Sequence, residues 1–219
     1  MKKILSVAVL GSTGYVGLEL VKILIRHPNI QIKFLGCENS PSKDIREFDQ
    51  NIVIDTLPKL DLNNNFDPKN YDLVFLSLPH GVSHKFVKNF NRKIKIIDLS
   101  ADFRLDSEKL YSKNYNNDHA CPELLNQFIY GLPEINKDVL NTNFDVAVPG
   151  CYPTSVLIPL IPLLEKNLIK TDNIIIDSKS GYSGAGKKFD LNNIKNKLEF
   201  NFYNYNTNEH RHICEIQQE

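Results

Sequence analysis

The chain has 219 residues, enough for one large domain or two small ones, with a hydrophobic fraction of 42% that is ordinary for a globular protein. Its 26 basic and 26 acidic residues give a formal net charge of +0, which gives no overall attraction to nucleic acid or to an anionic membrane. No apolar run approaches the roughly 18 residues of a membrane span, so we expect neither kind of partner.

The first element expected is a strand over Ile4–Leu10, ended by the run Gly11-Ser12-Thr13-Gly14-Tyr15-Val16-Gly17. Apolar residues at helical spacing then continue to His27-Pro28, and residues 30–35 form a second strand. This order predicts a βαβ unit in a parallel sheet. Because the glycines follow a strand and open a helix, they favour binding of a dinucleotide pyrophosphate over a turn that binds nothing.

The segment after the second strand bears on the choice of dinucleotide. Glu38 lies where an acidic residue would hold a ribose hydroxyl of NAD. Ser40, Ser42 and Lys43 lie just beyond it and could instead contact the 2′-phosphate of NADP. Residues 39–70 are polar and mostly loop, with a possible strand at 51–56. The residues alone leave NAD and NADP open.

Two more buried strands are expected at 73–77 and 94–98, with a crossover helix over Val82–Phe90. The second is followed by Asp98-Leu99-Ser100-Ala101-Asp102-Phe103-Arg104, at the end of a strand where ligands bind in open α/β sheets. Arg104 can bind a carboxylate or phosphate through two hydrogen bonds, or pair locally with Asp98 or Asp102.

Cys151 follows a third apolar run, in the turn Val148-Pro149-Gly150-Cys151-Tyr152-Pro153-Thr154, before an apolar helix over 155–168. A helix N-terminus stabilises a thiolate, the attacking form of cysteine. The four cysteines form no CxxC pair, which favours free thiols and a cytoplasmic location. Beside a nicotinamide, such a thiol predicts acyl transfer followed by hydride transfer; a buried structural cysteine is the alternative.

The last part of the chain carries two further candidate segments. A strand at 174–177 leads into the donor-rich run 180–187, which either binds an anion or is an ordinary surface hairpin. The run His210-Arg211-His212-Ile213-Cys214-Glu215 supplies histidines for acid/base work. If the run is extended, His210, His212 and Cys214 share one face, which also suits a metal. We rank catalysis first, a surface turn second and metal binding last, and so predict no metal.

These motifs together resemble N-acetyl-gamma-glutamyl-phosphate reductase, over essentially the whole chain. The resemblance is carried by GSTGYVG, LSLPHG, DLSADFR, YGLPE, PGCYPT, SGYSGAGK and HRHICEI. Aspartate-semialdehyde dehydrogenase, which frames its cysteine differently, is the alternative. The implied fold class is α/β, with an N-terminal Rossmann-like parallel sheet at 1–148 that binds NADP. An incomplete α+β catalytic domain at 149–219 follows.

The resemblance implies the reaction and the residues that perform it. Cys151 would attack N-acetyl-glutamyl phosphate, and NADPH would reduce the thioester to the semialdehyde in arginine biosynthesis, in a homo-oligomer. His210 would be the acid/base group, with His212 as the alternative. The substrate residues would be Arg104, Ser183, Gly184, Tyr205, His212 and Glu215. The cofactor residues would be Gly11, Ser12, Thr13, Gly14, Tyr15, Val16, Gly17, Ser40 and Ser77.

Members of this family continue well past the HRHICEI segment, whereas this chain ends at Glu219. We therefore expect a truncated chain, whose activity is in question. A non-catalytic NADP-binding module is the competing hypothesis, and it predicts nucleotide binding without turnover.

Overall fold

The computed structural model describes residues 3–54, 56–90, 94–140, 145–187, 202, 204–207 and 209–219. By internal contacts the chain divides into two units, Met1–Gly150 and Cys151–Glu219. Each unit is described by itself.

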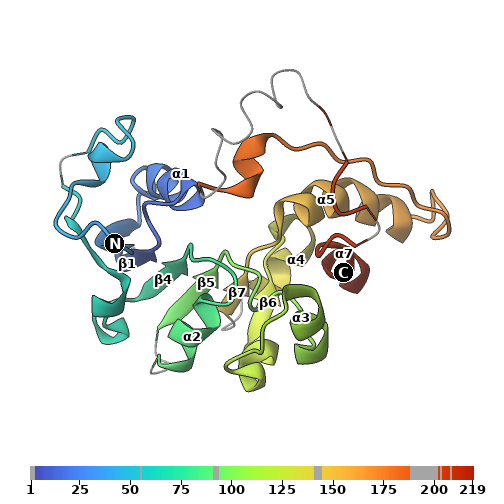
Figure 1. Ribbon diagram of the computed structural model, residues 1–219, viewed down its shortest axis with the longest axis horizontal. Helices are drawn as coiled ribbons and strands as arrows, with labels where there is room; N and C mark the ends of the chain where they lie inside the picture. Colours follow the sequence, from blue (N-terminus) through green and yellow to red (C-terminus); the bar gives the residue numbers. More distant parts are fainter. Residues whose placement is uncertain are drawn as a thin grey trace. The chain divides into compact units, whose positions relative to one another are not determined.

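The first unit is built on a seven-stranded sheet in the order β3-β2-β1-β4-β5-β7-β6 (Figure 1). All six strand pairs are parallel. The strands are β1 (Leu5–Leu10), β2 (Ile30–Cys37), β3 (Leu60–Leu62), β4 (Leu73–Leu76), β5 (Lys95–Asp98), β6 (Phe128–Tyr130) and β7 (Asp145–Ala147). The predicted parallel α/β sheet is therefore confirmed.

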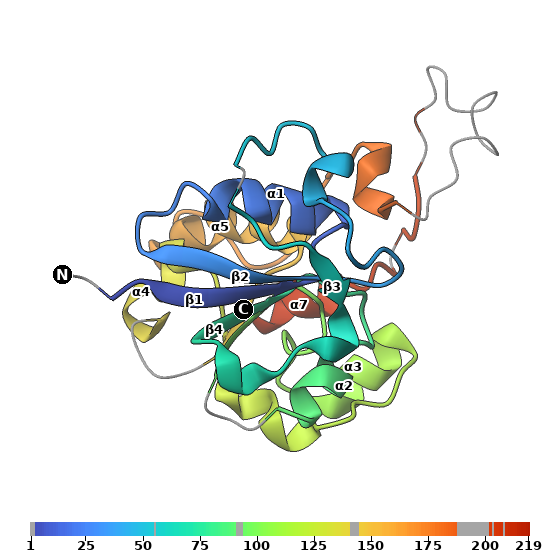
Figure 2. The ribbon, with the colours of Figure 1, turned by 90° about the vertical axis from the view of Figure 1, so that its left-hand side faces the viewer.

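Helices and short 3₁₀ segments connect these strands. The helices are α1 (Tyr15–Leu24), α2 (Ser83–Lys88), α3 (Glu108–Tyr115) and α4 (Pro133–Leu140). The 3₁₀ segments are η1 (Ile45–Glu47), η2 (Asn63–Asn65), η3 (Pro68–Asn70) and η4 (Pro122–Gln127). Figure 2 shows α1 on one face of the sheet and α2 and α3 on the other.

Alternating side chains of β1 divide the core into two layers, because successive residues of a strand point to opposite faces. Val7 and Val9 pack with the buried residues of α1, and Ala8 and Leu10 pack in the cluster that contains Val87 of α2. A strand with apolar residues on both faces is expected in a parallel sheet covered on both sides. The continuous apolar run of β1 is thus explained.

The possible strand at 51–56 is wrong: residues 51–54 form a turn and irregular backbone, and Asp55 lies outside the described residues. The third strand instead forms at Leu60–Leu62, where it pairs with residues 35–37 of β2. Ile52 is buried and Val53 is 83% exposed. The run has β-branched residues, which favour a strand, but only Ile52 of this pair is buried in the core.

The second unit contains α5 (Cys151–Glu165), η5 (Tyr182–Ala185) and α7 (Ile213–Gln218), and α5 contacts α7. The strand expected at 174–177 is not formed: residues 174–180 have no regular structure, and Ile175 is 92% exposed. No segment of the described chain pairs with these residues, and a strand needs a neighbour for its backbone hydrogen bonds. The β-branched residues favour a strand, but β-propensity does not show whether a neighbouring strand is present.

Candidate functional site

The glycine turn (residues 11–17) joins β1 to α1 in a backbone path that only glycine allows at two positions. Gly11 has φ +73°, and a Cβ there would lie 2.2 Å from the Ser77 carbonyl oxygen. A Cβ on Gly17 would lie 2.3 Å from the carbonyl oxygen of Gly11. The tight turn and the close approach of α1 to it therefore require these two glycines.

Neighbouring strands hold the glycine turn in place. The backbone N–H of Ser12 and its fully buried hydroxyl both donate to the Gly36 carbonyl, at 2.8 and 2.9 Å. The Gly11 N–H donates to Oδ1 of Asn63, at 3.0 Å. Asn63 begins η2 directly after β3. The turn is thus tied to β2 and to the end of β3, which makes it rigid before any ligand binds.

Gly14, the N-cap of α1, tests whether the turn fits a dinucleotide. Its φ is −71°, and a Cβ there would lie 3.5 Å from the Gly11 carbonyl oxygen, an ordinary contact. The protein's own packing therefore does not require glycine at this position. Tyr15 and Val16, the first residues of α1, are 45% and 56% exposed. An open helix N-terminus beside a residue without a side chain suits the close approach of a pyrophosphate.

Ser40 and Ser77 lie at the same edge of the sheet as the glycine turn. Ser77 follows β4, and its N–H donates to the Leu10 carbonyl, at 2.9 Å. Ser40 lies beyond the end of β2, after the exposed Glu38. β1 lies between β2 and β4, and the chain runs outward from β1 through β2 to β3 before it crosses back to β4 on the other side of β1. Ligands of open α/β sheets bind at such a reversal of strand order, beyond the carboxyl ends of the strands.

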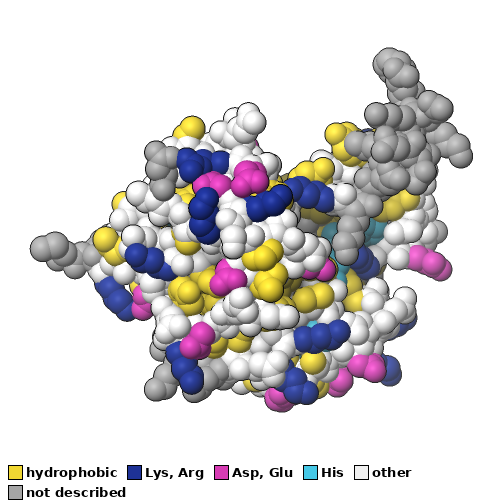
Figure 3. All heavy atoms as spheres, turned by 60° about the vertical axis from the view of Figure 1, so that its left-hand side comes forward, with side chains coloured by type: hydrophobic (Ala, Val, Ile, Leu, Met, Phe, Trp, Pro, Cys, Tyr) yellow, Lys and Arg dark blue, Asp and Glu magenta, His cyan; other side chains and the backbone are white. Residues whose placement is uncertain are grey.

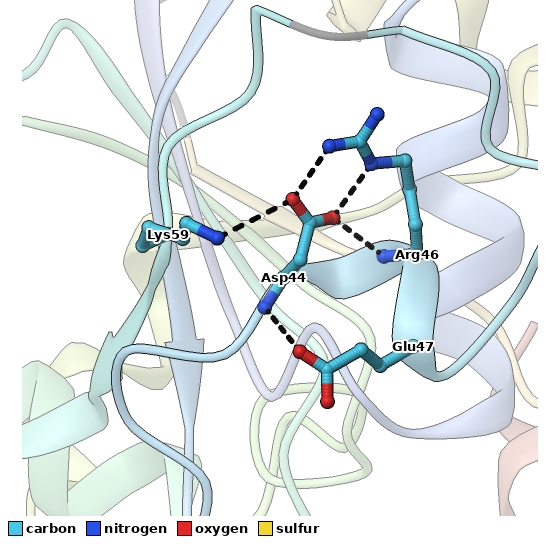
Figure 4. A network of polar contacts seen from close by, with 4 residues as sticks. All are labelled: Asp44, Arg46, Glu47 and Lys59. Atoms are coloured by element: carbon cyan, nitrogen blue, oxygen red, sulfur yellow. Dashed lines mark hydrogen bonds and ion pairs between the residues drawn. The ribbon is translucent and has the colours of Figure 1, made fainter.

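Basic side chains follow β2, around the carboxylate of Asp44 (Figure 4). Asp44 accepts hydrogen bonds from the backbone N–H and the guanidinium of Arg46, and Lys59 lies 3.6 Å away. These contacts, above all those with Arg46, hold the pKa of Asp44 well below its usual range. Lys43, next in the chain to Asp44, is exposed. The negative charge of Asp44 is therefore neutralised within its own cluster.

On the face drawn in Figure 3, Lys and Arg side chains are interspersed with Asp and Glu, and no large region carries charge of one sign. Among the described residues, no helix is both long enough and apolar enough to cross a membrane.

The predicted Asp98–Arg104 segment is a buried polar network after β5. Ser100 donates from its hydroxyl and its N–H to Asp98, at 2.7 and 3.1 Å. Asp102 accepts from the N–H groups of Gly81 and His84 and from the Tyr111 hydroxyl, which donates at 2.8 Å. The carboxylates therefore fix the loop after β4 as well as their own.

Burial, and next to it the nearby charge of Asp102, raises the pKa of Asp98 to about 6. The hydrogen bonds from Ser100 oppose this effect without cancelling it. A carboxyl group in this state changes charge between mildly acidic and neutral pH.

Arg104 is 5% exposed and donates to two backbone carbonyls, those of Val148 at 2.7 Å and Leu99 at 3.0 Å. Val148 follows β7, three residues before Cys151. The sequence suggested that Arg104 binds a ligand or pairs with a nearby aspartate. The structure adds a third role, in which its guanidinium donates to the backbone. The predicted role of Arg104 in substrate binding stays a prediction.

Cys151 is exposed and is the first residue of α5. The helix begins four residues earlier than the predicted start at 155, and it contains Pro159 and Pro162. Pro153 also lies in its first turn, where proline is tolerated because the first N–H groups of a helix have no intrahelical partner. The thiol predicted as nucleophile is therefore at the N-terminus of a helix.

A tyrosine–histidine cluster (Tyr152, Tyr205, His210 and His212) lies beside this helix start. The Tyr152 ring meets the His210 and His212 rings edge-on, with centroids 5.1 and 5.9 Å apart. The Tyr205 hydroxyl lies 2.8 Å from that of Tyr152 and 3.4 Å from Nε2 of His210. The predicted residues Tyr205, His210 and His212 are thus brought together around the chain neighbour of Cys151.

Burial, and next to it the positive charge of Arg211, lowers the pKa of His210, so its imidazole is neutral at neutral pH. Burial also raises the pKa of Tyr205, as does its hydrogen bond with Tyr152. His210 and Tyr205 are therefore both uncharged at neutral pH.

The run 210–214 is not extended, so the condition under which His210, His212 and Cys214 would share one face is not met. His212 is the N-cap of α7, in helical conformation, and Ile213 and Cys214 are in the helix. Cys214 donates through Sγ to the Arg211 carbonyl, and burial raises its thiol pKa. No group of three or more His, Cys, Asp or Glu side chains with metal-binding geometry occurs among the residues that can be described. His212 is 6% exposed and Glu215 is 1% exposed.

The run 180–187 forms the short turn η5, which contains Ser183 and Gly184. Ser180, just before it, accepts a hydrogen bond from the Tyr152 hydroxyl, at 2.7 Å. The run is thus tied to the start of α5, although Ser183 and Gly184 are exposed.

Family models identify both units. The model "Semialdehyde dehydrogenase, NAD binding domain" matches residues 6–143, more than half of the chain. The chain belongs to the semialdehyde dehydrogenase family. The model "Semialdehyde dehydrogenase, dimerisation domain" matches residues 151–219.

Curated relatives include proteins named N-acetyl-gamma-glutamyl-phosphate reductase. That of Ehrlichia canis (strain Jake) is 44% identical over 98% of this chain, and that of Acinetobacter baylyi is 42% identical over 97%. In both cases the match covers 62% of the relative, so this chain spans less than two thirds of the length of these proteins. The resemblance to this group of semialdehyde dehydrogenases is confirmed.

Among solved structures, aspartate semialdehyde dehydrogenase II from Vibrio cholerae matches with a TM-score of 0.55 and 19% identity. The match covers 74% of this chain and 47% of that one. At this identity the likeness concerns the fold alone, and it agrees with the α/β sheet described above.

Three residues with clear structural roles were not predicted from the sequence. Asn63 binds the glycine turn, and Tyr152 and Ser180 form the hydroxyl contacts of the second unit. Tyr152 lies in the PGCYPT motif and Ser180 in the SGYSGAGK motif, so the sequence marked both segments as candidate sites. The signal for Asn63 was weaker, because the strand before it was predicted about ten residues too early.

Proposed function

We propose that this semialdehyde dehydrogenase reduces N-acetyl-glutamyl 5-phosphate to N-acetyl-glutamate 5-semialdehyde and phosphate, with NADPH, in arginine biosynthesis. The observation that carries the proposal is Cys151 at the N-terminus of α5, beside a cluster with a neutral histidine. The names of relatives that are 42–44% identical support the choice of substrate. Four free thiols agree with a cytoplasmic location.

The covalent step follows from the chemistry of a thiolate. Cys151 is the first residue of α5, and the attacking form of a cysteine is its thiolate. The sulfur attacks the acyl carbon, the carbon–oxygen bond to phosphate breaks, and phosphate leaves with the electron pair, which gives a thioester. A bound nicotinamide supplies the hydride that reduces this thioester. Collapse of the resulting tetrahedral oxyanion releases the aldehyde and returns the Cys151 thiolate.

The other residues bind and orient the reactants. His210 is the proposed acid/base group, since its neutral imidazole can hold a proton near the substrate oxygen. Arg104, Ser183, Gly184, Tyr205, His212 and Glu215 are the proposed substrate contacts. The proposed cofactor contacts are residues 11–17 with Ser40 and Ser77, where the open side of Gly14 leaves room for the pyrophosphate.

NADP is preferred over NAD in this proposal because of the cations that follow β2. Lys43, Arg46 and Lys59 gather there with two carboxylates. Asp44 accepts hydrogen bonds from Arg46 and lies 3.6 Å from Lys59 (Figure 4), and Glu47 lies 3.9 Å from Lys43. The cations of this group therefore outnumber its carboxylates. A 2′-phosphate carries negative charge that such cations attract. Calorimetric titration with NADPH and NADH tests the preference, with tighter binding of NADPH expected and equal binding contradicting it.

We also propose that the chain pairs with a second copy through its second unit. The matching family model is described as a dimerisation domain, and the unit exposes Ile158, Leu163 and Ile175. Exposed apolar side chains of this size favour burial against another protein surface. Sedimentation velocity over a range of concentrations tests this, with a dimer expected and a monomer at all concentrations contradicting it.

The reverse reaction tests the proposed activity. NADP-dependent oxidation of N-acetyl-glutamate semialdehyde in the presence of phosphate is followed by the absorbance of NADPH, with Cys151→Ser alongside. Turnover by the unmodified chain and none by Cys151→Ser supports the proposal. NADP binding with no turnover from either protein contradicts it and favours a nucleotide-binding module. Aspartate semialdehyde as a second substrate tests the related activity.

A further inference from the structure

The hydroxyl groups of the second unit form a hydrogen-bonded chain that ends at His210. Ser180 Oγ lies 2.7 Å from the Tyr152 hydroxyl, which lies 2.8 Å from the Tyr205 hydroxyl. The Tyr205 hydroxyl in turn lies 3.4 Å from Nε2 of His210. The Tyr205 hydroxyl donates to that of Tyr152, which donates to Ser180. Each hydroxyl has a single proton, so Tyr205 has none left to donate to His210.

The direction is set at the far side of the His210 ring. The backbone N–H of His212 donates to Nδ1 of His210, at 3.2 Å. A backbone amide can only donate, so Nδ1 must be the unprotonated nitrogen. A neutral imidazole has one N–H, which is then on Nε2. Nε2–H therefore donates to the Tyr205 hydroxyl, which agrees with the donation of the Tyr205 proton to Tyr152.

The groups around the ring agree with this neutral form. The His212 ring lies 4.8 Å from that of His210, and the Arg211 guanidinium is next to it in the chain. Arg211 and burial both disfavour a second proton on His210. The Tyr152 and Tyr205 rings meet it edge-on, with centroids 5.1 and 5.5 Å away. A protonated His210 would also place an N–H against the N–H of His212.

We propose that Tyr152 and Ser180 are positioning residues that, through Tyr205, keep the proton of His210 on Nε2. The resting ring then meets a reacting group as a hydrogen-bond donor, suited to the oxyanion that forms when the thioester is reduced. Proton abstraction by His210 requires it to lose the hydrogen bond at Nδ1 first. This inference rests on the proposed function for its catalytic meaning, but not for its test.

The test is the ¹⁵N NMR spectrum of the histidine rings in the full chain, assigned with His210→Gln. We expect Nε2 of His210 to be protonated and Nδ1 to be unprotonated. In Tyr152→Phe, which retains the ring and removes one oxygen, Tyr205 loses its acceptor and can donate to Nε2. A population with the proton on Nδ1 then appears, in which the hydrogen bond from the His212 N–H to Nδ1 is lost. A smaller population of this kind appears in Ser180→Ala.

Tyr71→Phe is the matched control, since it removes the same oxygen from a tyrosine that packs against Phe66 in the first unit. We expect it to leave the His210 signals unchanged. A proton on Nδ1 in the unmodified chain overturns the proposal. So do His210 signals that are identical in Tyr152→Phe, Ser180→Ala and the unmodified chain.

Turnover gives a second readout that separates this inference from the proposed function. With an active chain, Tyr152→Phe lowers kcat several-fold and leaves KM nearly unchanged, because the tautomer and not substrate binding is altered. A KM increase at constant kcat contradicts the positioning role. If no turnover occurs, the proposed function fails, and the NMR experiment still decides the state of His210.

Discussion

The glycine turn of the first unit and the tyrosine–histidine cluster of the second are held by different forces. The turn is fixed by backbone packing and by hydrogen bonds that it donates to the Gly36 carbonyl and to the Asn63 side chain. The cluster is fixed by hydroxyl and imidazole contacts near the surface, and Tyr205 is 47% exposed. Substitutions at Gly11 and Gly17, where a Cβ meets backbone, should therefore affect stability and binding together, whereas those in the cluster should affect chemistry alone.

The largest effect on stability is expected from Gly11→Ala. The added Cβ meets the Ser77 carbonyl oxygen, and alanine is strained at φ +73°. We expect a loss of about 3 kcal/mol in the free energy of unfolding, measured by urea denaturation.

Gly14→Ala is the matched control, because its Cβ makes only an ordinary contact and its φ is −71°. Its free energy of unfolding should change by less than about 0.5 kcal/mol. Its affinity for NADPH should fall by about tenfold or more, because the side chain occupies the space needed for close approach. Undiminished affinity in Gly14→Ala contradicts the cofactor site.

Buried charge in the first unit gives the next largest effect. The pKa of Asp98 is raised to about 6, so the folded state binds its proton more tightly than the unfolded state does. Stability from this group is therefore present below about pH 4 and is lost as the pH rises through about 6. Relative to Asp98→Asn, the unmodified chain should lose about 2–3 kcal/mol over this range. If the free energy of unfolding depends on pH in the same way in both proteins, Asp98 does not have a raised pKa in the folded state.

The glycine turn and Asp98 differ in how far the sequence alone predicts them. The glycine spacing after Ile4–Leu10 predicts β1, the turn and α1, because steric demands there are local. The apolar runs likewise predict β2, β4, β5 and β7. The burial of Asp98 and Asp102 depends on packing between distant segments, so the sequence shows the carboxylates but not their state.

Non-local packing also explains the wrong predictions. Residues 51–54 and 174–176 have β-branched residues but no neighbouring strand in the described chain. Residues 210–214 would bring His210, His212 and Cys214 to one face only if they were extended, and α7 begins at Ile213. The hydrogen-bonded chain from Ser180 to His210 joins residues up to 53 positions apart, which no local pattern reveals.

Removal of the Asn63 side chain should have a smaller effect. Asn63→Ala leaves the Gly11 N–H without its acceptor, at an expected cost of about 1–2 kcal/mol in the free energy of unfolding. Asn63→Asp keeps an acceptor oxygen and should be more stable than Asn63→Ala. It should nevertheless weaken NADPH binding, since it adds a negative charge beside the pyrophosphate. If Asn63→Asp binds NADPH as well as the unmodified chain does, the pyrophosphate is not held there.

The smallest effect on stability is expected from Tyr205→Phe. The hydroxyl is near the surface, so the free energy of unfolding should change by less than about 0.5 kcal/mol. The rate of semialdehyde oxidation should nevertheless fall, because Nε2 of His210 loses its partner. An equal loss of stability and activity would mean that the cluster, like the glycine turn, is mainly structural.

The most direct measurement of the central claim is the mass of the chain after incubation with N-acetyl-glutamyl phosphate in the absence of cofactor. Without hydride the thioester should accumulate, as an acyl adduct on the peptide that contains Cys151. The adduct should be absent from Cys151→Ser and present in Cys214→Ser. A folded chain that forms no adduct, or forms it on another cysteine, would contradict Cys151 as the nucleophile.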